Sequence, residues 1–180
     1  THGHEDHVAD VQRIATNNPN AILISNFAII SWFGEKGLNG HPMNHGGKRQ
    51  FEFGTVKYVN AIHSSVLPDG SYGGNPGGFV LWDENSCFYI AGDTALTQDM
   101  KLIPQLCPTL DFAILPIGDN FTMGYEEAIV AAQFVQCKKV VACHFDTFPP
   151  IQINHDEVLT AFQSNNIELY LPEIGEKIEF

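Results

Sequence analysis

Six residues near the start of the chain, His2-Gly3-His4-Glu5-Asp6-His7, constrain its fold more than any other feature of the sequence. In an extended or looped backbone, alternate side chains point the same way, so His2 and His4 can bind one ion while Asp6 and His7 turn toward a second. The alternatives are a tag remnant or a solvated histidine cluster. The interleaved acids and the amphipathic helix pattern that follows favour metal ligands. The fold must then bring the remaining ligands from elsewhere in the chain.

Length and charge narrow the classes of protein to which the chain can belong. Its 180 residues, 44% hydrophobic and 17% charged, predict one globular domain spanning residues 1–180. The formal net charge of −12, with no basic run to offset it, argues against binding nucleic acid. A small anionic substrate is not excluded, because bound divalent metals reverse the local sign of a site.

The cysteines and the apolar segments indicate the cellular compartment in which the protein is expected. Four cysteines, Cys87, Cys107, Cys137 and Cys143, lie far apart without a C-x-x-C pair, which favours reduced, buried thiols over a disulfide scaffold. No apolar run approaches the ~20 residues of a membrane helix, and nothing resembles a signal peptide. We therefore expect a cytoplasmic protein with no membrane partner.

The pattern of apolar residues and breakers predicts alternating strands and helices, which is typical of the mixed α/β class. The expected strands cover residues 21–25, 51–58 with a continuation over 59–62, 79–83, 87–91, 112–116, 140–143, 167–171 and 177–180. The expected helices cover residues 8–16, 27–33, 98–106, 125–136 and 156–164. A glycine-rich loop is predicted over residues 67–78.

Three further candidate ligands follow predicted strands. His63, Asp93 and His144 each stand where an apolar strand meets a loop. A single histidine in such a place is more often a hydrogen-bonded structural residue, but three polar residues at successive strand ends predict a site built on loops of a rigid sheet. Imidazole and carboxylate ligands without thiolate suit Zn²⁺, Mn²⁺ or Fe.

The motif H-x-H-x-D-H, together with His63, Gly92-Asp93-Thr94 and His144, resembles the metallo-β-lactamase superfamily. The sequence around three of these residues is similar to that of a branch of metal-dependent hydrolases related to L-ascorbate-6-phosphate lactonase. The similar segments are Ala-Ile-His-Ser-Ser around His63, Ala-Gly-Asp-Thr-Ala-Leu around Asp93 and Cys-His-Phe-Asp-Thr-Phe-Pro around His144. The resemblance implies a four-layered αββα sandwich with the site at one edge, between two sheets. Such proteins carry several strands before the motif, so we expect this domain to be incomplete at its N-terminus, with an uncovered sheet face.

The resemblance also implies roles for the seven side chains. His2, His4 and His63 would hold a first metal, Asp6, His7 and His144 a second, and Asp93 would bridge both. The cofactors would be two divalent ions, zinc first, with manganese or iron as alternatives. Asp6 and Asp93 would be catalytic, and the substrate would be a small-molecule lactone, other ester or phosphoester attacked by an activated hydroxide.

Residues around these ligands are candidates for positioning them or for contacting substrate. Metal-bound imidazoles usually donate their other nitrogen to a carboxylate, so Asp10, Asp119 and Asp146 are candidates, with a helix-face charge or a turn residue as the alternative. His45 and Ser64 are candidates for the substrate side. For His45 the alternative is a glycine-rich turn with a solvated histidine. His41 and His155 are expected at the surface.

Three other functions fit the sequence less well than hydrolysis. A di-iron redox protein of this superfamily would carry a glutamate where His4 stands and an attached flavin domain. A nuclease would add a clamping domain or a basic arm. A binding protein with a vestigial site would have lost ligands, whereas all seven are present. The sequence therefore favours a hydrolase acting on a small molecule, and it leaves a homo-oligomer open.

Overall fold

The structure, a computed structural model, describes residues 1–179. The strands are β1 (Leu23–Asn26), β2 (Gly40–Met43), β3 (Lys48–Phe51), β4 (Gly54–Asn60), β5 (Gly77–Trp82), β6 (Cys87–Ile90), β7 (Phe112–Pro116), β8 (Lys139–Cys143) and β9 (Glu168–Tyr170). The helices are α1 (Glu5–Val8), α2 (Val11–Asn17), α3 (Phe27–Gly34), α4 (Ile103–Leu106), α5 (Tyr125–Phe134) and α6 (His155–Ser164), with short 3₁₀ helices η1 (Gln98–Leu102) and η2 (Pro149–Ile151).

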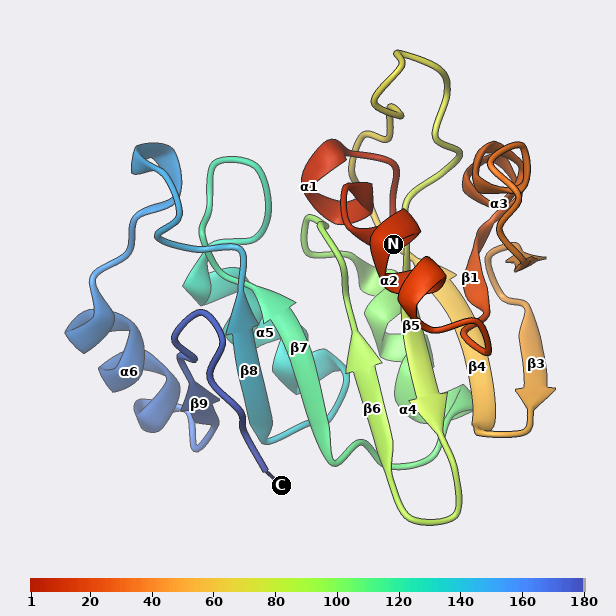
Figure 1. The fold of residues 1–180 in the computed structure, drawn as a ribbon. Coiled ribbons are helices and arrows are strands. Elements are labelled where there is room, and N and C mark those ends of the chain that lie inside the picture. Colours follow the sequence, from red (N-terminus) through yellow and green to blue (C-terminus); the bar gives the residue numbers. More distant parts are fainter. Residues whose placement is uncertain (180) are drawn as a thin grey trace.

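One mixed sheet of seven strands, in the order β3-β4-β5-β6-β7-β8-β9, forms the centre of the molecule (Figure 1). Strands β3 to β6 pair antiparallel, and β6 to β9 pair parallel. Consequently β4, β6, β7 and β8 all run in the same direction. Their carboxyl ends meet at one edge of the sheet, the upper edge in Figure 1, and this edge positions the candidate site.

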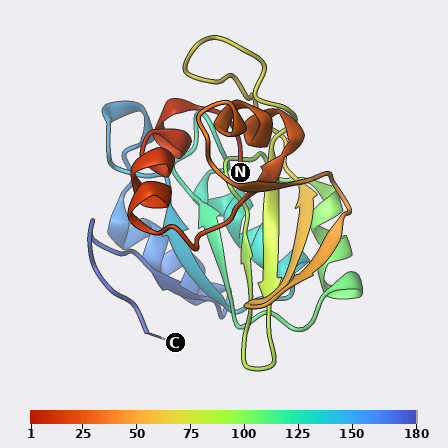
Figure 2. The ribbon, with the colours of Figure 1, turned by 45° about the vertical axis from the view of Figure 1, so that its right-hand side comes forward.

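Side chains that alternate along the strands divide the protein into four layers. On one face of the large sheet, Val80, Tyr89 and Leu115 pack against α4, α5 and α6 in the main core. On the other face, β4 and β5 pack against the small parallel sheet β1-β2, with Tyr58 and Met43 in the interface. Helix α3 covers that small sheet from outside, so helices lie on both sides of the stacked sheets, as Figure 2 shows. The predicted α/β class and layer order are confirmed.

The face of β6, β7 and β8 that points away from the main core carries apolar side chains that are only half-buried. They are Phe88, Ile90, Phe112, Ile114 and Val141. Phe88 and Phe112 stack their rings across the strand pair, with centroids 5.0 Å apart. Apolar rows of this kind are usually covered in a native assembly. The expectation that further strands cover such a face stays a prediction.

Several expected elements differ in the structure. The expected helix 8–16 is divided into α1 and α2, with a turn at residues 9–10 between them. Strand β2 and most of the polar edge strand β3 were not expected, because Gly40 and Pro42 disfavour a strand locally. The expected strand 51–58 is interrupted by a turn at residues 52–53, which separates β3 from β4. The expected last strand is wrong over residues 177–179, where no neighbouring strand of the described chain pairs with them. Phe180 lies outside the described residues.

All four cysteines are free in the described chain, in agreement with the expected reduced thiols, and Cys87 and Cys137 are buried. Burial raises the pKa of the Cys87 and Cys143 thiols to about 12, which keeps both protonated near neutral pH. Over residues 1–179, no helix is both long enough and apolar enough to span a bilayer.

Candidate metal centre

The N-terminal motif divides between two backbone conformations. His2 and His4 lie on an extended segment, and His4 is the residue that precedes α1, its carbonyl accepting a hydrogen bond from the His7 amide at 3.0 Å. Asp6 and His7 lie within the single turn of α1. As a result, His2 Nε2 and His4 Nδ1 are 3.0 Å apart, and His7 Nε2 is 3.3 Å from Asp6 Oδ2. The extended part and the helical turn therefore present two adjacent groups of donors, as the sequence pattern predicts.

The other three candidate ligands come from loops at the carboxyl edge of the large sheet. Strands β4 and β8, which precede His63 and His144, are four strand spacings apart, or about 19 Å. The loops fold inward across this gap. Thr94 is fully buried beside Asp93. It connects two of these loops, because its hydroxyl accepts a hydrogen bond from the Ile62 amide at 2.9 Å. One buried hydroxyl thus joins the loop of His63 to the loop of Asp93.

All three loops and the N-terminal motif converge on one carboxylate. Asp93 is 4% exposed, and four imidazole nitrogens approach its Oδ2 atom. The Nε2 distances are 3.9 Å for His2, 3.3 Å for His7, 3.7 Å for His63 and 3.2 Å for His144. His4 completes the cluster, with its ring centroid 5.1 Å from that of His63. The structure thus brings together all seven side chains that the sequence analysis selected.

These donors fit divalent metal ions better than they fit a hydrogen-bonded network. The carboxylate oxygen has about two lone-pair sites, so it cannot accept four imidazole hydrogens. Ligands around a tetrahedral zinc ion lie about 3.3 Å from one another, which is close to the distances above. Three overlapping groups have donor atoms within 4.8 Å of one another: His2, His4 and His63; His2, His7 and Asp93; and Asp6, His7 and His144.

The local electrostatics favour the protonation states that ions need at His2, His63 and Asp93, whereas the hydrogen bond to Asp93 raises the pKa of His144. Burial, with His7 nearby, lowers the pKa of His2 to about 3, and burial also lowers that of His63. Burial alone would raise the pKa of Asp93, but hydrogen bonds from His144 and His7 outweigh it and hold that pKa well below its usual range. At neutral pH, His2 and His63 are neutral with lone pairs available, and Asp93 is charged.

Two nearby serines support the histidine motif. The Ser65 hydroxyl accepts a hydrogen bond from the buried Gly3 amide at 3.0 Å. Ser64, a candidate from the sequence, has its hydroxyl 3.2 Å from His4 Nε2. That contact orients the His4 ring so that Nδ1 faces His2.

Sequence reasoning missed Asn26 as a residue that supports the loop over the site. Its side chain accepts from the Ile29 amide at the start of α3 and donates to the Gly73 carbonyl at 2.8 Å. The residue type was a usable signal, since Asn directly before an apolar helix is typical of an N-cap.

The remaining candidates lie outside the three donor groups. His45 stacks on the Tyr58 ring and its Nε2 is 2.8 Å from the Pro76 carbonyl. Asp119 is exposed in the loop after β7, where it accepts from the Asn120 amide. Asp146 contacts His155 rather than a candidate ligand, and Asp10 pairs with Arg13. The assignment of these residues to substrate or to ligand support stays a prediction.

The glycine at position 118 is required by the backbone of His144. A Cβ atom at Gly118 would overlap the His144 carbonyl oxygen and lie 2.9 Å from the Cβ of Ile151. We expect Gly118→Ala to displace the His144 loop, to lower the free energy of unfolding by about 1–3 kcal/mol and to weaken metal binding. Chemical denaturation and zinc titration measure the two effects. Gly34→Ala is the matched control, because a Cβ there meets no described atom within 4 Å; equal effects in both variants would contradict the assignment.

Comparisons with known proteins point in one direction. Residues 1–145 match the family model of the Beta-lactamase superfamily domain. The chain is 59% identical over 179 residues to a UPF0173 metal-dependent hydrolase of Flavobacterium johnsoniae, covering 99% of this chain and 79% of that protein. It is 49% identical over 157 residues to the UPF0173 metal-dependent hydrolase YtkL of Bacillus subtilis, covering 84% of this chain and 68% of that protein.

Solved structures agree on the fold. Igni18, a metallo hydrolase of the hyperthermophilic archaeon Ignicoccus hospitalis, matches with a TM-score of 0.87 and 31% identity, covering all of this chain and 78% of that one. An isothiocyanate hydrolase from Delia radicum gut bacteria matches with a TM-score of 0.73 at 19% identity, covering all of this chain and 74% of that one. At that identity, the second match bears on the fold alone.

Proposed function

Because this chain belongs to the UPF0173 metal-dependent hydrolases of the metallo-β-lactamase superfamily, we propose that it hydrolyses a small-molecule lactone, ester or phosphoester with two divalent ions. The observation that carries the proposal is the approach of four imidazole nitrogens to a single buried oxygen of Asp93, at 3.2 to 3.9 Å. Such convergence is costly in a folded protein unless cations share the donors.

The proposed ligand sets follow the donor groups. His2, His4 and His63 would hold one ion, and Asp6, His7 and His144 would hold the other, with Asp93 shared by both. Zinc is the proposed metal because the donors are imidazole nitrogens and carboxylate oxygens, with no thiolate among them. The same donors also suit manganese or iron.

When bound, a pair of such ions lowers the pKa of water toward ~7 and polarises a carbonyl or phosphoryl oxygen. The chain's own residues supply the rest. Asp93 keeps its negative charge between the imidazoles, and His2 stays neutral at pH 7. Asp6 has a side chain that is 67% exposed and lies beside His7, so its carboxylate can take up a proton from the attacking water at the open side of the site.

The substrate class rests on charge and on the sequence resemblance. The net charge of −12 disfavours a polyanion such as nucleic acid as the substrate. A lactone is included because the sequence around the ligands resembles the sequences of the branch related to L-ascorbate-6-phosphate lactonase. The reaction is then attack at a carbonyl or phosphorus centre of a small molecule.

A substrate screen with zinc-loaded protein tests this proposal. We expect turnover of at least one class among sugar-acid lactones, nitrophenyl esters and nitrophenyl phosphoesters. His4→Ala should lose that turnover, because it removes one donor. His41→Ala, which changes a histidine on β2 outside the site, should keep it. Protein that holds two zinc ions per chain and turns over none of these compounds would count against the proposed substrate class.

A further inference from the structure

His144 differs from His2 and His4 in how its ring is held. The His2 and His4 rings each have a hydroxyl beside the second nitrogen, from Thr1 at 3.2 Å and Ser64 at 3.2 Å. In contrast, Nδ1 of His144 is buried and has no hydrogen-bond partner among the described residues. A metal-binding imidazole is normally oriented through that second nitrogen. Apart from the contact of its Nε2 with Asp93 at 3.2 Å, the orientation of His144 therefore depends on its backbone.

The backbone of the His144 loop is in an unfavourable conformation. His144 and Asp146 both have left-handed backbone angles, with φ of 55° and 61°, and neither is glycine. Such angles persist only where surrounding contacts enforce them. A cavity of about 530 Å³ borders residues 144–147, so packing leaves this loop unsupported on that side. Hydrogen bonds hold the loop, together with the packing of Phe145 against the main core.

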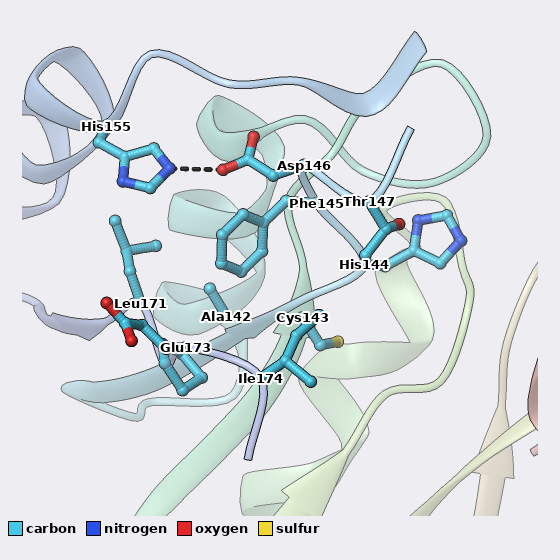
Figure 3. A pocket seen from close by; sticks show the side chains of 11 residues that line it. Ala142, Cys143, His144, Phe145, Asp146, Thr147, His155, Leu171, Glu173 and Ile174 are labelled. Atoms are coloured by element: carbon cyan, nitrogen blue, oxygen red, sulfur yellow. Dashed lines mark hydrogen bonds and ion pairs between the residues drawn. The ribbon is translucent and has the colours of Figure 1, made fainter. Parts of the chain in front are cut away.

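Asp146 supplies those hydrogen bonds. Its amide donates to the Ile151 carbonyl at 2.9 Å, and its Oδ1 accepts from the Ile153 amide at 3.0 Å. Its Oδ2 is 2.5 Å from Nε2 of His155, a contact that Figure 3 draws as a dashed line. His155 is the first residue of α6, whose Val158 and Phe162 are fully buried in the main core. The pair thus ties the loop of His144 to a helix that cannot move independently.

We propose that Asp146 and His155 are positioning residues, a clamp that holds the His144 loop so that its imidazole faces the second metal position. The proposal rests on the proposed two-metal function. In Figure 3 the His144 ring points away from the contact between Asp146 and His155, and these two residues line the cavity. The sequence analysis predicts His155 at the surface, and its side chain is 52% exposed. Its function comes only from its contact with Asp146.

Zinc titration of the metal-free protein, with a competing chelator, tests the clamp. We expect Asp146→Ala and His155→Ala to weaken the second zinc about 10- to 100-fold, the effect typical of residues that orient a ligand, while the first zinc binds as in wild type. His155→Gln should restore much of the affinity, because its amide can still donate to Asp146. The controls are Asp99→Ala and His41→Ala, which change exposed or peripheral side chains outside the donor groups. Wild-type affinity for both ions in both alanine variants would overturn the clamp.

Hydrogen exchange of metal-free protein separates failure of the clamp from failure of the proposed function. If wild type binds a single zinc, the two-metal function fails. The clamp is then judged by the amides of Asp146 and Ile153, which we expect to exchange at least about tenfold faster in His155→Ala. Unchanged exchange at both amides would show that His155 does not hold the loop. Faster exchange confined to residues 144–153 would support the clamp whichever number of ions is bound.

Discussion

Asp93→Ala is expected to abolish hydrolysis and the binding of the second ion together. The carboxylate of Asp93 is approached by the N-terminal motif and by the loops of His63 and His144, and its charge is almost completely buried. Loss of the group costs several kcal/mol of transition-state stabilisation, so we expect kcat/KM to fall on the order of 10³-fold or more. Metal analysis and steady-state kinetics of the same preparation measure both effects.

Two further variants sharpen that experiment. Asp93→Asn keeps the shape of the side chain and removes its charge, so an equal loss would assign the effect to charge rather than to a cavity. Asp99→Ala is the matched control, because Asp99 is exposed on η1 and accepts a hydrogen bond from Asn60 outside the donor groups. Full activity and two bound ions in Asp93→Ala would refute the proposed bridging role.

Removal of the metals is expected to have the second largest effect. Without cations, five imidazoles and two carboxylates stay crowded at the sheet edge, and the buried charge of Asp93 is compensated only by hydrogen bonds from His7 and His144. An ion present at a thousandfold excess over its Kd stabilises the folded state by about 4 kcal/mol. For a domain of this size, loss of one such ion lowers Tm by roughly 8–16 °C.

The measurement is a thermal melt and an activity assay before and after chelation, with metal content determined each time. Activity should disappear with the metal and return when zinc is added back. Separate additions of manganese and iron identify which ion restores the highest rate. Protein that keeps its melting temperature and its activity after complete loss of metal would contradict a metal centre at this edge.

Local sequence patterns were sufficient to predict most of the central elements. Strand β7 and helix α5 were expected almost at their observed bounds, because β7 is a continuous apolar run and α5 has helical periodicity between clear breakers. Strand β2 could not be predicted in this way. It contains Gly40 and Pro42, and it becomes a strand through pairing with β1 beneath α3. Its strand conformation depends on tertiary contacts, which local propensity does not contain.

The residues that position the candidate ligands also act through tertiary contacts that local sequence patterns do not predict. The left-handed conformation of His144 is not encoded by its residue type, and it depends on the close approach of Gly118 and on the contact between Asp146 and His155. The hydroxyl of Thr94 acts by joining two loops that are far apart in the chain. Neither role leaves a signal in a single sequence, because each depends on a neighbour that only the fold supplies.

The sequence by itself determined the chemical nature of the donors: five imidazoles and two carboxylates, with four of them fixed near one another by the motif from His2 to His7. The tertiary structure decided that these donors meet. Strands β4, β6 and β8 are separated by intervening strands, yet they run in the same direction and end at the same edge of one sheet. Strand direction and order arise from pairing across the whole chain, and for that reason no local pattern around His63, Asp93 or His144 contains their common position.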